Sequence, residues 1–228
     1  ITKNYRIGET LDAILGNWGA FDPITSQTTN EQNIFTYKFR NAEKVTFTAH
    51  RIDVPKLLSD VKTHIELNRA SDVQYTVNDL SSLMYHQHAD RYINEKVASW
   101  SLDLEPREGH FDKRVTVEVP IKATGAYRIT ATVENGNTSS IVYWLNNTTM
   151  VKMATNNGQM FYLADSTTGK PLPNTKLDFF GYRHTRTKDG KVQNVVKKFI
   201  ETADEDGMIV VNKTIAPTNM QWITTARD

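Results

Sequence analysis

The chain has 228 residues, of which 39% are hydrophobic, so it is long for one β-sandwich and has enough apolar residues for the cores of two domains. Its 27 basic and 26 acidic residues give a formal net charge of +1, which indicates neither a nucleic-acid partner nor contact with an anionic membrane. The cysteine count of zero excludes a disulfide framework, a cysteine nucleophile and a thiolate metal site within these residues.

The first 31 residues carry the weakest pattern, a short stretch of helical spacing followed by turn-rich sequence. We interpret residues 1–31 as a connector or the tail of a preceding element. Because the chain starts at Ile1 with neither a methionine nor a signal peptide, we expect a processed product or an excised piece. No apolar run approaches the roughly 20 residues that span a bilayer.

Clear alternation begins near Ile34. Aromatic side chains occupy every second position from Phe35 to Phe39, and apolar residues alternate again from Val45 to Ala49. Period-two alternation is typical of strands that bury one face. The two segments therefore predict a β-hairpin packed on a core.

Helical spacing replaces the alternation after this hairpin. Asp53 is placed to cap a helix that has Pro55 in its first turn, and two groups of apolar residues follow at helical intervals. We predict a helical insertion over residues 53–96 within the first domain.

Strand patterns then resume, and Trp100 shares a predicted face with Ala98, Leu102 and Leu104. Asn135-Gly136 is a strong hairpin turn. The strands predicted here are residues 97–104, 115–121, 125–133 and 139–145. Together with the hairpin they predict a first sandwich over residues 32–146.

A second sandwich is predicted over residues 147–228. Gly169, Pro171 and Pro173 mark a long turn, and Asp204 to Gly207 marks a tight one. The strands predicted around these turns are residues 159–164, 176–182, 192–202 and 208–211.

Several segments resemble those of macroglobulin domains in bacterial alpha-2-macroglobulin-like proteins. Thr168 to Leu177 looks like the family's "tGkPvpgakV" hairpin, Thr202 to Gly207 like its "T-D-x-x-G" turn, and Trp100 to Leu104 like its "W-x-L-x-L" strand. Similar segments occur at residues 45–53 and 120–129. The resemblance implies a mainly all-β fold of two tandem immunoglobulin-like, macroglobulin-type β-sandwiches, the first with the helical insertion.

The same resemblance implies a function. Family members trap proteases, in many cases with a Cys-Gly-Glu-Gln thioester, and this chain has no cysteine to form one. We therefore expect a non-catalytic framework fragment of such a protease trap, with no cofactor and an extracytoplasmic location: periplasmic, anchored to the outer membrane or secreted. The implied partners are the neighbouring macroglobulin domains, and proteases for the full-length parent.

One pattern in the sequence suggests metal binding, which would not fit this assignment. His86 and His88 would point the same way on a strand, but they diverge on the helix that we predict there, so solvent-exposed histidines are the favoured interpretation. A metal-dependent hydrolase would also need a third ligand that the sequence does not offer. The carboxylates from Asp204 to Asp206 lack the partners of a calcium cage and are interpreted as a solvated turn.

The most basic segment is the hairpin tip that starts at Arg183. It is either a docking surface for an acidic partner or neighbouring domain, or a charged edge that prevents aggregation between sheets. The candidate interaction residues are Arg183, Arg186, Lys188 and Lys191, with Lys197 and Lys198 close behind. The alternative function is an adhesion or carbohydrate-binding module, which an exposed aromatic platform would favour.

Overall fold

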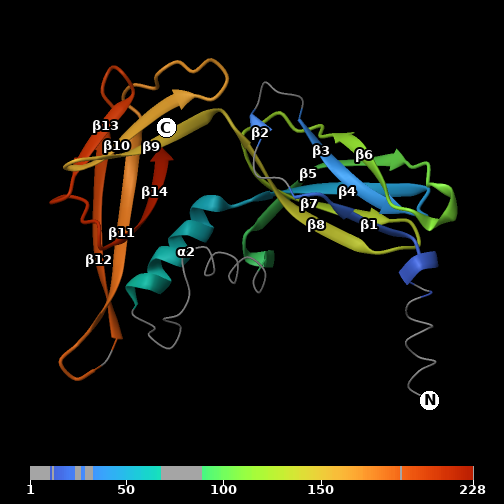
Figure 1. Ribbon diagram of the computed structural model, residues 1–228, viewed down its shortest axis with the longest axis horizontal. Helices are drawn as coiled ribbons and strands as arrows, with labels where there is room; N and C mark the ends of the chain where they lie inside the picture. The colour runs from blue at the N-terminus through green and yellow to red at the C-terminus, as the bar shows by residue number, and fades with distance from the viewer. Residues whose placement is uncertain are drawn as a thin grey trace. The chain divides into compact units, whose positions relative to one another are not determined.

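The computed structural model describes residues 11, 13–23, 27–28, 33–67, 89–190 and 192–227. The chain divides into two compact units (Figure 1). The first unit comprises residues 1–53 and 93–146, and the second comprises residues 54–92 and 147–228. The second unit is thus made from two separate pieces of the sequence.

The first unit is a β-sandwich of a three-stranded and a five-stranded sheet. The three-stranded sheet has the order β1 (Trp18–Phe21), β3 (Ile34–Arg40), β6 (Lys113–Glu118). The five-stranded sheet has the order β2 (Gln27–Thr28), β8 (Thr138–Asn146), β7 (Gly125–Val133), β4 (Lys44–Ile52), β5 (Ile93–Asp103). All pairings are antiparallel except β2 with β8.

Aromatic side chains from both sheets fill the core of this unit. Phe35, Tyr37 and Phe39 are buried as the alternation predicted, and the Tyr37 ring meets Phe47 edge-on at a centroid distance of 5.4 Å. Trp100 stacks on Phe47 at 5.3 Å and is partly buried, so it faces the core as predicted. Edge-on and offset-stacked rings are favourable because of their quadrupoles.

The segment interpreted as a connector contributes strands to this sandwich, which corrects the assignment of residues 1–31 for the part that is described. Strand β1 pairs with β3 from Trp18↔Arg40 to Phe21↔Tyr37, and β2 pairs with the end of β8. Gly19 is required for this close approach, because a Cβ there would overlap the Tyr37 hydroxyl. So short a strand carries too little alternation to be recognised in the sequence.

The predicted insertion also ends earlier than expected. Ile93 pairs with Ile52, so residues 93–96 belong to strand β5 and are not helical. Two register shifts, between Ala49 and His50 and between His50 and Ile52, interrupt the alternation here and account for the misplaced boundary. Residues 68–88, which include most of the second predicted helical group, lie outside the described residues.

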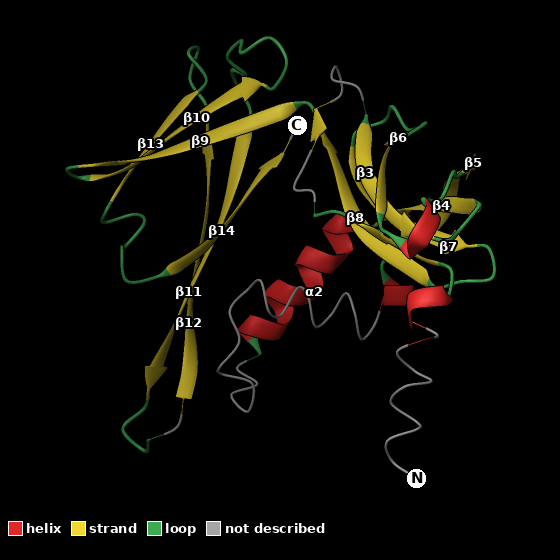
Figure 2. Cartoon of the chain, turned by 45° about the vertical axis from the view of Figure 1, so that its right-hand side comes forward, coloured by secondary structure: helices red, strands yellow, loops and turns green. Residues whose placement is uncertain are grey.

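The second unit has three layers (Figure 2). One sheet has the order β13 (Met208–Asn212), β10 (Gly158–Asp165), β9 (Thr148–Thr155). The facing sheet has the order β12 (Val192–Thr202), β11 (Lys176–Arg186), β14 (Gln221–Arg227). Helix α2 (Val54–Glu66) is the third layer, and 3-10 turns occupy Ala89–Arg91 in this unit and Glu108–His110 in the first.

Phe161, Leu163, Leu177 and Phe179 form the centre of the core between the two sheets of the second unit. The predicted fold class, mainly all-β with immunoglobulin-like sandwiches, is confirmed. Strand β14 was not predicted, because Trp222, Ile223 and the threonines that follow show no clean alternation of apolar and polar residues.

Two core tyrosines of the first unit make a pH-dependence testable. Burial raises the pKa of Tyr37 to about 12, and burial likewise raises that of Tyr143 to about 12. Both phenols stay neutral in the folded chain while unfolded tyrosines ionise near pH 10. The stability that they contribute is therefore complete below pH 10 and is lost as the pH rises through about 12.

We expect thermal unfolding to shift to lower temperature over this interval, because Tyr37 and Tyr143 ionise only as the chain unfolds. The Tyr37→Phe and Tyr143→Phe variants should each show a shallower alkaline decline, measured by thermal melts at stepped pH. An alkaline decline as steep in both variants as in the parent sequence would contradict the assignment.

Candidate interaction surfaces

Helix α2 packs on the face of sheet β12-β11-β14 that points away from the other sheet. Val61 and Ile65 are buried against Phe180 and Tyr182, with Leu57, Val196 and Ile223 around them. The sequence placed this helix with the first domain, whereas it belongs to the second unit. The physical reason is that β11 carries apolar side chains on both faces, and α2 covers the outer one.

Polar contacts surround the apolar interface between α2 and the sheet. Lys62 lies 3.5 Å from Asp178 and 5.7 Å above the Phe180 ring, and Lys198 forms an ion pair with Glu66. At the end of the helix, Asn194 Nδ2 donates to the Ile65 carbonyl at 2.8 Å. This bond satisfies one of the carbonyls that a helix end leaves without an intrahelical partner.

The residues that follow the insertion are held on the same unit. The Tyr92 hydroxyl donates to Asp60 Oδ2 at 3.0 Å, and Lys56 Nζ donates to the Arg91 carbonyl at 3.0 Å. Burial and this hydrogen bond raise the pKa of Tyr92 above its ordinary value. The end of the insertion at Arg91 and Tyr92 therefore contacts α2.

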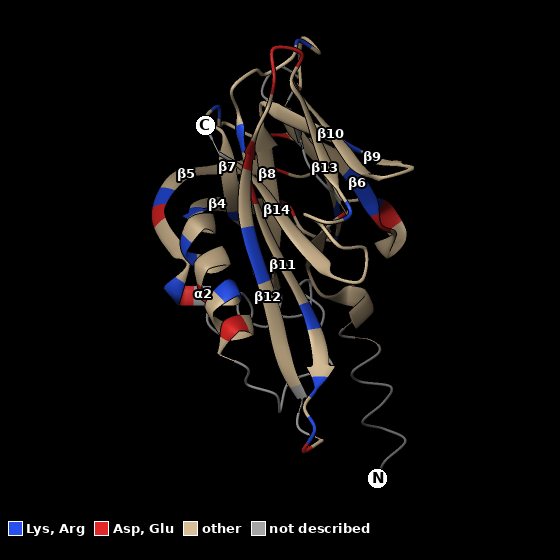
Figure 3. Cartoon of the chain, turned by 90° about the vertical axis from the view of Figure 1, so that its left-hand side faces the viewer, with Lys and Arg blue, Asp and Glu red and all other residues tan. Residues whose placement is uncertain are grey.

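Strands β11 and β12 continue past the sheet as a two-stranded ribbon. Strand β14 pairs with β11 only as far as Tyr182, whereas the pairing of β11 with β12 continues from Arg183↔Val195 to Arg186↔Val192. Figure 3 shows basic positions on the β11 strand of this ribbon and at its tip. The predicted hairpin is thus a projecting element with little of the unit's core beneath it.

Only some of the predicted basic side chains are exposed on this ribbon and have no partner named below. Arg183, Arg186 and Lys188 are exposed, and so is Asp189. Lys198 is paired with Glu66, and Lys197 Nζ donates to the Thr214 carbonyl at 3.0 Å. Lys191 lies outside the described residues. Adjacent strand positions point to opposite faces, which explains why Lys197 and Lys198 have different partners.

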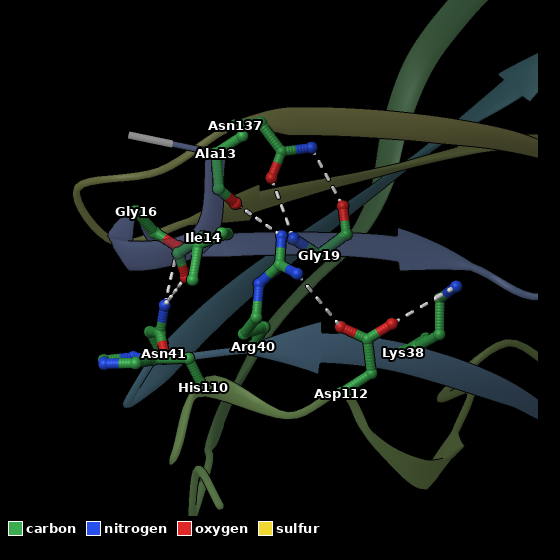
Figure 4. Close-up of polar contacts among 10 residues, drawn as sticks. All are labelled: Ala13, Ile14, Gly16, Gly19, Lys38, Arg40, Asn41, His110, Asp112 and Asn137. Atoms are coloured by element: carbon green, nitrogen blue, oxygen red, sulfur yellow. Dashed lines mark hydrogen bonds and ion pairs between the residues drawn. The ribbon is translucent and has the colours of Figure 1, made fainter. Parts of the chain in front are cut away.

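A polar network holds the N-terminal segment on the first unit (Figure 4). Arg40 Nη2 donates to the Ala13 carbonyl at 2.6 Å, and Asn41 Nδ2 donates to the carbonyls of Ile14 and Gly16 at 2.8 and 3.0 Å. Asn137 exchanges two hydrogen bonds with the Gly19 backbone, at 2.8 and 2.9 Å.

Charged groups complete this network. Asp112 pairs with both Lys38 and Arg40, at 3.6 and 3.7 Å, and both cations also lie over the Trp18 ring. His110 Nδ1 donates to Asn41 Oδ1 at 2.9 Å. The arrangement is a structural clasp, because its hydrogen bonds and ion pairs join residues of the same unit.

The structure describes one of the two metal-binding candidates that the sequence suggested. His86 and His88 lie outside the described residues, and the described residues contain no group of three or more His, Cys, Asp or Glu that could hold a metal. Asp204 Oδ1 accepts hydrogen bonds from the amides of Asp206 and Met208, so this carboxylate closes the turn, as the solvated-turn interpretation expected. None of the described helices is long and apolar enough to cross a membrane.

The geometry defines a class of protein: tandem immunoglobulin-like β-sandwiches. The sequence matches no protein-family model and no curated protein sequence. The structure does have counterparts among solved structures.

The chain is similar to the crystal structure of native alpha-2-macroglobulin from Escherichia coli spanning domains NIE-MG1. The TM-score is 0.51 at 13% sequence identity, and the match covers 94% of this chain and 97% of that one. The crystal structure spanning domains MG0-NIE-MG1 of the same protein gives a TM-score of 0.50 at 11% identity, covering 93% of this chain and 64% of that chain. At these identities the likeness establishes a shared fold.

The position of α2 yields a stability prediction. Replacing the buried Ile65 with alanine should lower the free energy of unfolding of the second unit by about 3 kcal/mol, since the cavity opens under two sheet strands. Hydrogen exchange should show reduced amide protection in β11 and β12 and unchanged protection in β3 and β4. The matched control is Leu67→Ala at a position that is 59% exposed, where we expect little change. Loss of protection in β3 and β4 instead would contradict the assignment.

Proposed function

We propose that this chain is a non-catalytic framework part of an alpha-2-macroglobulin-like protease inhibitor of the bacterial cell envelope. The observation that carries the proposal is the fold shared with the NIE-MG1 domains over 94% of this chain and 97% of that one. The macroglobulin-like segments of the sequence support it independently. In this role the two units act as rigid bodies that hold other domains in position.

The proposal assigns no reactive centre to the chain. A thioester needs a cysteine, and the sequence has none. Mechanical trapping needs a segment that a protease can cut and a shell large enough to enclose it, and 228 residues cover only part of a protease surface. The chain by itself should therefore neither catalyse a reaction nor trap a protease.

A two-arm protease assay tests this function. Trypsin is incubated with the fragment or with the longer parent protein, and then with either a large protein substrate or a small chromogenic peptide. The parent should block trypsin's cleavage of the large substrate and leave its cleavage of the small peptide unchanged, because only the small peptide diffuses into a closed shell. The fragment should change neither rate. Trapping by the fragment alone would contradict its role as framework. A parent that leaves the cleavage of both substrates unchanged would contradict the protease-trap assignment.

The alternative function, adhesion or carbohydrate binding, would be favoured by an aromatic platform, and the described residues do not form one. Among the described residues the exposed tryptophan and phenylalanine side chains are Trp144, on β8, and Phe111, next to a 3-10 turn. These two side chains come from different elements of the first unit. We therefore retain the framework role.

Within this function we propose that the basic ribbon tip, formed by Arg183, Arg186 and Lys188, docks on an acidic surface of a neighbouring macroglobulin domain. The three side chains are exposed and project beyond β14, and two-stranded projections with little core beneath them gain order from such contacts. Lys191 belongs to the same predicted set. Exposed rim charges mainly change association rate and salt dependence.

Cleavage at the ribbon tip tests the docking. Trypsin should cut after Arg186 and Lys188 readily in the fragment and at least about tenfold more slowly in the parent at low salt, and salt should restore cutting because it screens the contact. Mass spectrometry of timed digests gives both rates, and Lys213, in an exposed turn of the same unit, is the control site. Equal cutting of the tip in fragment and parent would rule out the docking.

A further inference from the structure

The outer face of sheet β13-β10-β9 brings three methionines together. Figure 2 shows the three strands side by side. Phe161, Leu163 and Ile209 point into the core, so the residues that alternate with them point to the outer face. The register arranges the outward residues in two rows across the sheet: Met208, Tyr162 and Val151 in one row, and Val210, Met160 and Met153 in the next.

This face is apolar and reaches the surface. Val210 is 70% exposed, Met153 is 49% exposed and Val151 is 47% exposed, and the other three side chains of the two rows are partly buried. None of these six positions carries a charge. A contiguous exposed face without charge is a feature of binding sites more than of ordinary protein surface.

Met160 lies between the other two methionines. It stands directly opposite Met153 on β9, while Met208 on β13 stands opposite Tyr162 and is therefore a diagonal neighbour of Met160. Opposite residues in an antiparallel pair have Cβ atoms about 5 Å apart, and diagonal neighbours are about 7 to 8 Å apart. A methionine side chain has three rotatable bonds, so the three thioether sulfur atoms can meet at one point above the sheet.

We propose that Met153, Met160 and Met208 bind a soft monovalent metal ion, Cu(I), through one thioether sulfur from each of the three strands. Thioether and thiolate sulfur are the ligands that select Cu(I), whereas carboxylates, carbonyls and water suit Mg²⁺, Ca²⁺ or Mn²⁺. The sequence has no cysteine, so no thiolate of this chain competes for the ion. This metal site goes beyond the framework role and does not depend on it.

The neighbours of the three thioethers suit an ion of single charge. Val151 and Val210 supply branched apolar side chains beside the methionines. The Tyr162 hydroxyl donates to the Gly169 carbonyl at 3.1 Å, which fixes the ring between Met208 and Val151. Contacts between a thioether and an aromatic ring are favourable. Because apolar surroundings replace water, a single charge loses less hydration free energy at this face than a double charge does.

Met150 provides an internal control. It lies on the same strand as Met153 and is 41% exposed, but it pairs with the buried Leu163 and therefore belongs to the opposite face. Leucine keeps the volume and apolar character of methionine and lacks the sulfur atom. A protein partner that docks on the outer face through apolar contacts would tolerate a substitution of Met by Leu, whereas a metal ion would lose a ligand.

The experiment titrates the full chain, labelled at its methionine methyl groups, with silver nitrate in chloride-free buffer. Ag(I) has the same preference for soft sulfur ligands as Cu(I) and does not change its oxidation state during the titration. We expect the methyl resonances of Met153, Met160 and Met208 to shift together in the NMR spectrum and to stop shifting at one equivalent. The resonances of Met150 and Met220 should not move. Cu(I) kept reduced by ascorbate should produce shifts of the same three resonances.

Substitutions test the ligand set in the same titration. Met160→Leu should weaken Ag(I) binding at least about tenfold, because loss of a ligand costs no less than loss of the groups that orient ligands. Met150→Leu should leave the affinity unchanged. Val210→Met adds a thioether directly opposite Met160 and should tighten binding.

Four outcomes overturn the proposal. One is the absence of any shift of the three resonances at millimolar Ag(I), and another is an affinity that Met160→Leu leaves unchanged. The third is displacement of Ag(I) by an excess of Zn²⁺, which would show that the ligands are not soft thioethers. The fourth is Ag(I) binding that Cu(I) does not reproduce, which would rule out copper as the ion.

Discussion

Burial of strand β11 on both of its faces is the constraint on which the second unit depends. Leu177 and Phe179 point into the core between the sheets, while Phe180 and Tyr182 point to the opposite side and are buried by α2. A sheet with one solvated face would leave those two rings in water. A glycine is also needed at position 181 of this strand, because a side chain there would collide with the Trp222 ring that lies over Gly181.

This requirement makes the second unit discontinuous in sequence. The chain leaves strand β4, supplies α2 to the second unit and returns to the first unit as β5. Ion pairs and the Asn194 bond to the Ile65 carbonyl fix the helix on its sheet. Folding of the second unit therefore requires residues that precede strands β5 to β8 of the first unit, and such non-local contacts are expected to slow folding.

The likeness to the NIE-MG1 domains at 13% identity shows how little sequence this architecture demands. Alternating apolar residues and well-placed turns suffice to define the sheets, while the exposed positions are free to vary. In this chain such exposed positions include Arg183, Arg186 and Lys188 on the projecting ribbon.

The sequence by itself determined the all-β class and most strands, since period-two alternation at Phe35 to Phe39 or Val45 to Ala49 follows from local geometry. It also identified the basic hairpin, because the positions of charged residues are known from the sequence alone. Only the tertiary structure decided that residues 18–21 are a strand, that α2 belongs to the second unit and that Lys198 is consumed by Glu66. Each of these depends on contacts between residues far apart in the chain. The apolar face of a helix shows that the helix packs against another surface. Which surface that is depends on the tertiary structure.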